Sequence, residues 1–88
     1  MEVKFRCCNS EKIRALADVV VSRGIIVRGF KVVEKDGDLF VAVPSRDFMA
    51  DGQKRYYNQV LFSDDEVRKQ FQTDLLENYE RWREDDQR

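Results

Sequence analysis

Apolar and polar side chains alternate along the first two thirds of the chain. This period of two is typical of strands that bury one face and expose the other. The pattern predicts strands over residues 3–7, 13–21, 25–33 and 39–43, and a fifth strand over residues 55–62, where tyrosine and other sheet-favouring residues gather. We expect these four to five strands to pair in chain order as a small antiparallel meander.

Turn-favouring residues separate the predicted strands. Residues 22–24 form a tight turn, and Asp36-Gly37 is a strong hairpin signal because this pair readily takes positive φ angles. Gly29 lies inside the third strand, where a glycine indicates a bulge or a close backbone approach. Pro44 cannot donate a ladder hydrogen bond, so it ends the fourth strand and opens a polar loop that runs to Asp51-Gly52.

The periodicity changes after residue 62. Ser63 and Glu66 have the spacing of a capping box, which predicts that Ser63 caps a helix. Apolar residues then recur every three or four positions and form one stripe on a helix of about six turns. The stripe consists of Val67, Phe71, Leu75, Tyr79 and Trp82. Strands followed by one long C-terminal helix give an α+β fold of two layers, which we expect to be a single domain over residues 1–88.

A single helix is too narrow to cover such a sheet. A helix is about 10 Å across, whereas four strands spaced roughly 4.8 Å apart make a sheet nearly twice as wide. The turn at residues 22–24 is flanked by segments that are apolar on both faces, and soluble monomers usually avoid exposing such patches. We therefore expect a homodimer. Its interface would contain Val19, Val20, Val21, Ile25, Ile26 and Val27. The alternative is that this hairpin is buried under the helix of its own chain.

The net charge of −1 hides an asymmetry along the chain. Residues 1–62 hold eleven basic and eight acidic side chains, whereas residues 63–88 hold five basic and nine acidic ones. Binding to nucleic acid requires clustered cations, because the affinity for phosphate comes largely from counterion release. The candidate phosphate-binding residues are Arg46, Lys54, Arg55, Arg68 and Lys69, joined by Arg28 and Lys31 if the third strand is exposed.

Two tyrosines, Tyr56 and Tyr57, follow Arg55 directly and offer stacking surfaces for unpaired bases. A plainer interpretation stays open, in which the cations are solvated strand ends and the tyrosines pack under the helix. The low pI, near 5.5, favours that interpretation because nucleic-acid-binding domains usually have a basic footprint.

The residue types present argue against an enzyme. The chain has no histidine, which is the commonest general acid–base residue and zinc ligand. Cys7 and Cys8 are adjacent, so in a strand they point to opposite faces and cannot share a tetrahedral metal site. We expect no catalytic residue, no metal and no cofactor. With no membrane-length apolar run and no secretory signal pattern, we also expect a cytoplasmic protein that binds neither membrane nor small-molecule substrate.

The segment Phe40–Arg46, with Asp51-Gly52 and Arg55 after it, resembles the F-V-A-M-P-S-K/R … D-G-x-x-R-D signature of the stage V sporulation protein G (SpoVG) family. Weaker similarity extends over nearly the whole chain, including residues 26–33 and the helix segment 76–79. The resemblance implies a dimer of small antiparallel sheets, each with a C-terminal helix. It also implies a DNA- and RNA-binding regulator of sporulation, septation and cell division, in which basic residues around the helix start contact nucleic acid.

The chain departs from the family pattern before and within the helix start. A His-Pro pair that the family usually carries is replaced within residues 56–61, and three acids, Asp64, Asp65 and Glu66, open the helix. Those acids cap the helix well but repel phosphate near Arg68 and Lys69. Two functions follow as hypotheses. The first is a non-enzymatic, dimeric DNA- or RNA-binding regulator, and the alternative is a dimeric protein–protein interaction module without nucleic-acid affinity.

Overall fold

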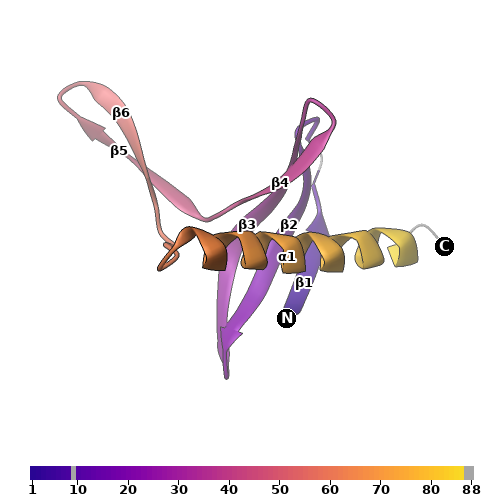
Figure 1. The fold of residues 1–88 in the computed structure, drawn as a ribbon. Helices are drawn as coiled ribbons and strands as arrows, with labels where there is room; N and C mark the ends of the chain where they lie inside the picture. The colour runs from indigo at the N-terminus through magenta and orange to yellow at the C-terminus, as the bar shows by residue number, and fades with distance from the viewer. Residues whose placement is uncertain (9, 87–88) are drawn as a thin grey trace.

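The computed structural model describes residues 1–8 and 10–86 and divides them into two sheets and one helix. The strands are β1 (Glu2–Cys7), β2 (Ile13–Ser22), β3 (Ile25–Lys35), β4 (Asp38–Ala42), β5 (Ser45–Ala50) and β6 (Gln53–Asn58), and the helix is α1 (Asp65–Asp86). Strands β1 to β4 form one antiparallel sheet in chain order, whereas β5 and β6 pair only with each other. Figure 1 shows α1 lying across the four-stranded sheet. The predicted α+β fold is confirmed.

The core lies between α1 and one face of the four-stranded sheet. It consists of Phe5, Ala15, Ala17, Val19, Phe30, Val32, Leu75 and Tyr79. Four residues of the predicted apolar stripe of α1, Phe71, Leu75, Tyr79 and Trp82, face this sheet, with the Phe71 ring 5.2 Å from that of Phe30 and the Trp82 ring 5.5 Å from that of Phe5. Val67, the first residue of the predicted stripe, is 45% exposed and lies outside the core. Each large apolar side chain buried in this way contributes about 1.5–3 kcal/mol. The apolar faces that the two periodicities predicted, one on the strands and one on the helix, therefore pack together in one hydrophobic layer.

The predicted bulge at Gly29 and the predicted hairpin turn at Asp36-Gly37 are both confirmed. Asp36 and Gly37 have φ angles of 54° and 84° and join β3 to β4 in a two-residue hairpin turn. Gly29 has a φ of 104° and lies in a bulge, where β3 advances three residues from Val27 to Phe30 while β2 advances two. An extra residue at this point bends β3 and increases its twist.

The region after Pro44 differs from the prediction. The expected polar loop contains strand β5, and the expected strand over residues 55–62 is confirmed only over residues 55–58, because β6 spans Gln53–Asn58. This strand pairs with β5 and does not extend the four-stranded meander. The turn between them is Asp51-Gly52, with φ angles of 53° and 75°. The two strands therefore form a hairpin with the same turn chemistry as Asp36-Gly37.

This β5–β6 hairpin, which we call the arm (residues 45–58), projects from the rest of the molecule in Figure 1. All of its residues are exposed except Ala50, which is half-buried. A hydrogen bond of 2.7 Å from the Gln59 N–H to the Pro44 carbonyl oxygen closes its base. An isolated two-stranded hairpin is only marginally stable in water, and the strands of the arm pair only with each other.

The second face of the four-stranded sheet, which we call the open face, is not covered by α1. Alternation along the strands places Leu16, Val20 and Val33 there, together with Asp18. The Asp18 carboxylate is 10% exposed and lies 3.2 Å from the Arg6 guanidinium and 3.5 Å from that of Arg28. Two arginines thus compensate the one buried acid of the described chain, as a desolvated charge requires.

Candidate nucleic-acid interface

Two arginines and two aromatic rings share one face of the arm. The register of the hairpin pairs Arg46 with Tyr57 and Phe48 with Arg55, and residues two apart on a strand point the same way. The rings of Phe48 and Tyr57 are 5.6 Å apart between centroids, with an interplanar angle of 59°. We call this set of four residues the arginine face. It combines positive charge with exposed aromatic surface.

The opposite side of the arm, which we call the lysine face, consists of Asp47, Met49, Lys54 and Tyr56. The Lys54 ammonium lies 3.3 Å from the Asp47 carboxylate and 5.6 Å from the centroid of the Tyr56 ring. The hydrogen bond to Asp47, followed by that to Tyr56, raises the pKa of Lys54 above its usual value. The charge of Lys54 is therefore already partnered within the arm.

Arg46 and Arg55 differ from Lys54 in this respect. Both side chains are exposed, and within residues 1–8 and 10–86 no carboxylate lies within ion-pair distance of either. A guanidinium is always charged and presents a planar set of donors that matches phosphate oxygens. These two arginines are thus the predicted cations best placed to receive an external anion.

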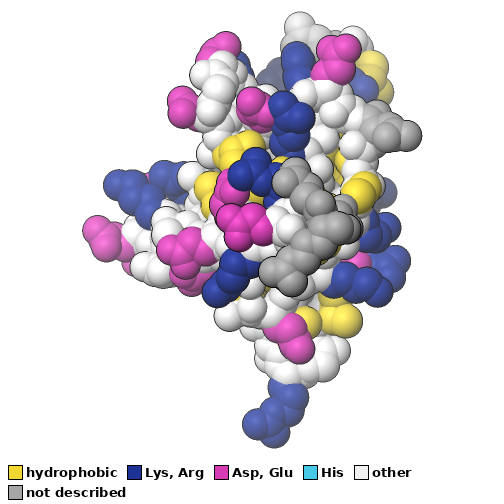
Figure 2. All heavy atoms as spheres, turned by 90° about the vertical axis from the view of Figure 1, so that its right-hand side faces the viewer, with side chains coloured by type: hydrophobic (Ala, Val, Ile, Leu, Met, Phe, Trp, Pro, Cys, Tyr) yellow, Lys and Arg dark blue, Asp and Glu magenta, His cyan; other side chains and the backbone are white. Residues whose placement is uncertain are grey.

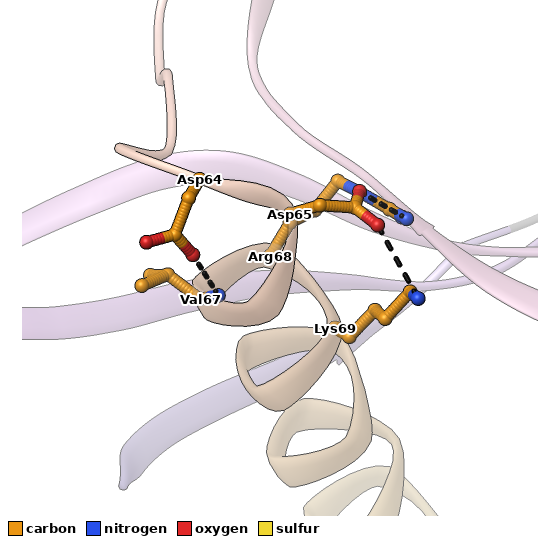
Figure 3. Close-up of polar contacts among 5 residues, drawn as sticks. All are labelled: Asp64, Asp65, Val67, Arg68 and Lys69. Carbon is orange, nitrogen blue, oxygen red and sulfur yellow. Dashed lines mark hydrogen bonds and ion pairs between the residues drawn. The ribbon is translucent and has the colours of Figure 1, made fainter.

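The helix start holds the remaining two predicted cations (Figure 3). The Asp65 carboxylate lies 2.9 Å from the Arg68 guanidinium and 3.3 Å from the Lys69 ammonium. The hydrogen bond from Arg68, and then that from Lys69, lowers the pKa of Asp65 below its ordinary value. Arg68 and Lys69 therefore share one local counterion, and a phosphate would have to compete with it.

The residue that caps α1 is not the one that the sequence predicted. The Asp64 carboxylate accepts a hydrogen bond of 2.9 Å from the Val67 N–H, and the helix begins at Asp65 (Figure 3). The capping box built on Ser63 is therefore wrong by one position. Asp64 takes the role instead because the chain becomes helical only after it, and its side chain then reaches the N–H three residues on.

An open hollow of about 590 Å³ connects the base of the arm to the helix start. Ser45 and Asn58 contribute from the arm, Arg68 and Asp65 from α1, and Val60 from the segment between them. The structure thus brings Arg68 near the base of the arm, where Arg46 is the second residue of β5. Lys54 and Arg55 lie farther along the arm, in β6.

Arg28 is partly engaged through its contact with Asp18, whereas Lys31 is exposed on the open face. Figure 2 views the molecule from the C-terminal end of α1 and shows Lys and Arg side chains interspersed with Asp and Glu. No single basic face is visible from this side. The arginine face of the arm is distinguished by Arg46 and Arg55, which lack acidic partners among the described residues.

The residues predicted at a dimer interface fall into three groups. Val19 is only 2% exposed and belongs to the core of its own chain, so its side chain is not on the surface. Val20 and Val27 are half-buried. Val21, Ile25 and Ile26 are more than half exposed at the end of the β2–β3 hairpin, which projects beyond α1 in Figure 1. The exposed apolar patch that motivated the dimer is therefore present, but smaller than predicted.

Sequence reasoning missed Phe48, which lies beside both arginines of the arm. Its signal was available, since Asp51-Gly52 fixes a two-residue turn and thereby pairs Phe48 with Arg55. Across residues 1–8 and 10–86, no group of three or more potential ligands has the arrangement of a metal site. In the same described residues, the helix is too polar to serve as a membrane span.

The comparisons with known proteins agree on one family. The model of the SpoVG family matches residues 1–81. A protein of Acetivibrio thermocellus named "Putative septation protein SpoVG" is 34% identical over 80 residues, covering 90% of this chain and 82% of that protein. A protein of the same name from Clostridium perfringens is 31% identical over 81 residues, covering 91% and 87%. No solved structure gives a significant match. With a family match over nearly its full length and two relatives above 30% identity, the chain belongs to the SpoVG family.

Proposed function

We propose that this protein is a non-enzymatic regulator that binds DNA or RNA and acts as a homodimer in the cytoplasm, in septation or sporulation. The observation that carries the proposal is the arginine face, where Arg46 and Arg55 lack acidic partners among the described residues and flank exposed rings. The septation names of the two relatives support the cellular role.

The paired cations of the candidate site add to this surface at little cost. Lys54, Arg68 and Lys69 each form an exposed ion pair with an aspartate. Exposed ion pairs contribute little to stability because water and salt screen them, so a phosphate can replace the aspartate without a large loss of stability. Nucleic-acid binding then gains from the counterions that leave the phosphates.

The proposed dimerisation is supported by the exposed end of the β2–β3 hairpin. Val21, Ile25 and Ile26 lie together there and are more than half exposed. A symmetric contact between two copies would cover the same patch on both chains and present two arms to one nucleic acid. Two linked arms bind more tightly than one because the second contact is intramolecular.

The proposal is tested by titrating labelled single- and double-stranded DNA and RNA with the protein at about 50 mM and about 200 mM salt. We expect binding at the lower salt and a large loss of affinity at the higher salt. Binding to none of these nucleic acids, or binding that is independent of salt, would overturn the proposal.

A second candidate function rests on the acidic helix start. Asp65 neutralises Arg68 and Lys69, which weakens the phosphate surface and favours a dimeric module that acts through protein partners. The two functions differ in their sensitivity to charge reversal. Under the second, Arg55→Glu leaves function in cells intact and Ile26→Glu abolishes it, whereas under the first both variants lose function.

A further inference from the structure

We propose, resting on the function above, that the arginine face is a stacking platform for unpaired bases, so that the arm prefers single-stranded nucleic acid to duplex. The rings of Phe48 and Tyr57 are 46% and 47% exposed, although aromatic side chains of this size are normally covered. No strand of the four-stranded sheet lies beside these rings, because β5 and β6 pair only with each other.

The four residues repeat one arrangement twice. Each cross-strand pair holds one arginine and one aromatic ring, Arg46 with Tyr57 and Phe48 with Arg55. The two pairs are separated by two residues along each strand, or roughly 7 Å. A base can stack on the ring of a pair while the arginine of that pair contacts the adjacent phosphate. Two successive nucleotides would then occupy two successive pairs.

A duplex cannot use these rings in the same way. Its bases are stacked on one another inside the helix, so the flat faces of the rings have no base surface to cover. Bases of a single strand are available, and aromatic stacking tolerates any base because every base has a π-face. Duplex binding would therefore use only the guanidinium groups, and would be weaker.

On the lysine face the cation and the ring already have partners within the arm, so this face supplies a matched control. The Tyr56 ring already lies 5.6 Å from the Lys54 ammonium, and the Asp47 carboxylate beside them repels phosphate. Tyr56 is nevertheless 66% exposed, more than Tyr57. The proposal thus distinguishes two neighbouring tyrosines by their partners rather than by their exposure.

The test measures the anisotropy of labelled oligonucleotides of about 12 nucleotides, as oligo(dT), oligo(U) and a mixed-sequence DNA duplex. The proteins are the full chain and its Phe48→Ala, Tyr57→Ala, Tyr56→Ala and Met49→Ala variants. We expect the full chain to bind the single strands at least several-fold more tightly than the duplex. We expect Phe48→Ala and Tyr57→Ala each to weaken single-strand binding roughly tenfold, and the two lysine-face variants to bind like the full chain.

Other outcomes separate this proposal from the one on which it rests. Equal or tighter duplex binding with unchanged Phe48→Ala and Tyr57→Ala variants would overturn the stacking platform and leave nucleic-acid binding intact. Equal losses on both faces would overturn the assignment to the arginine face. No binding to any probe would overturn both proposals. The fluorescence of Trp82, which packs on Phe5 in the core, reports for each variant that the fold is retained.

Discussion

A Cβ atom added to Gly29 would lie 3.3 Å from the Cβ atom of Pro44. Gly29 is the bulge residue of β3, and Pro44 is buried between the end of β4 and the start of the arm. Because Gly29 has no side chain, β3 leaves room for Pro44, after which the chain leaves the four-stranded sheet and enters the arm.

Replacing Gly29 should therefore be costly. Gly29→Ala adds strain at a φ of 104° and a contact that Pro44 must move to relieve, so we expect a loss of about 1–3 kcal/mol in the free energy of unfolding. Gly24→Ala is the matched control, since φ is 77° but no atom lies within 4 Å of the added Cβ. Urea unfolding followed by Trp82 fluorescence compares them. Equal losses in both variants would show that the contact with Pro44 has no role.

The helix cap makes a second prediction. Asp64→Ala removes the acceptor of the Val67 N–H and should cost about 1 kcal/mol, whereas Ser63→Ala should change the free energy of unfolding little. Thermal or urea unfolding of the two variants measures the difference. A larger loss in Ser63→Ala than in Asp64→Ala would restore the capping box that the sequence predicted.

A third prediction concerns Asp65, the counterion of Arg68 and Lys69 at the helix start. Asp65→Asn releases Arg68 and Lys69 from their shared carboxylate, so we expect tighter nucleic-acid binding with a steeper salt dependence. Glu66→Gln removes the same charge one residue later, but Glu66 has no ion-pair partner among the described residues. A smaller gain in affinity for Glu66→Gln than for Asp65→Asn would show that the gain comes from the release of Arg68 and Lys69. Identical gains in both variants would indicate that only the net charge of the helix start matters.

The proposed dimer makes a fourth prediction. Ile26→Glu places a charge in the exposed patch of the β2–β3 hairpin, and we expect sedimentation to change from twice the 10.5 kDa of one chain to a single subunit. Leu61→Glu is the control, because Leu61 is 82% exposed but lies outside this hairpin. A compact single subunit for the unmodified protein at micromolar concentration would contradict the dimer.

The burial of apolar faces explains which elements were predictable. Strands β1 to β4 and the stripe of α1 each bury one face, and burial imposes the periods of two and about 3.6 that a sequence displays. The arm buries neither face, so β5 carries no such period, and its Phe48 and Met49 fall where the sequence suggested a loop. The turn at Asp51-Gly52 and the sheet-favouring residues after Arg55 marked only the second half of the hairpin.

The candidate site was predictable to a similar degree. The spacing of Asp65 from Arg68 and Lys69 is three and four residues, so their pairing on a helix follows from the sequence alone. The pairing of Lys54 with Asp47 depends on the hairpin register and could not be inferred without it. The sequence therefore suggested five candidate cations but did not show which of them lack an acidic partner.

The arginines of the arm can be tested through the salt dependence of binding. The measurement is the slope of the logarithm of the binding constant against the logarithm of salt concentration, for the full chain and for Arg46→Gln/Arg55→Gln. We predict that the double variant binds more weakly and that its slope is smaller by roughly one for each phosphate that the arm no longer neutralises. Arg23→Gln, in the turn between β2 and β3, should keep the original slope. An unchanged slope in the double variant would contradict the assignment of phosphate binding to the arm.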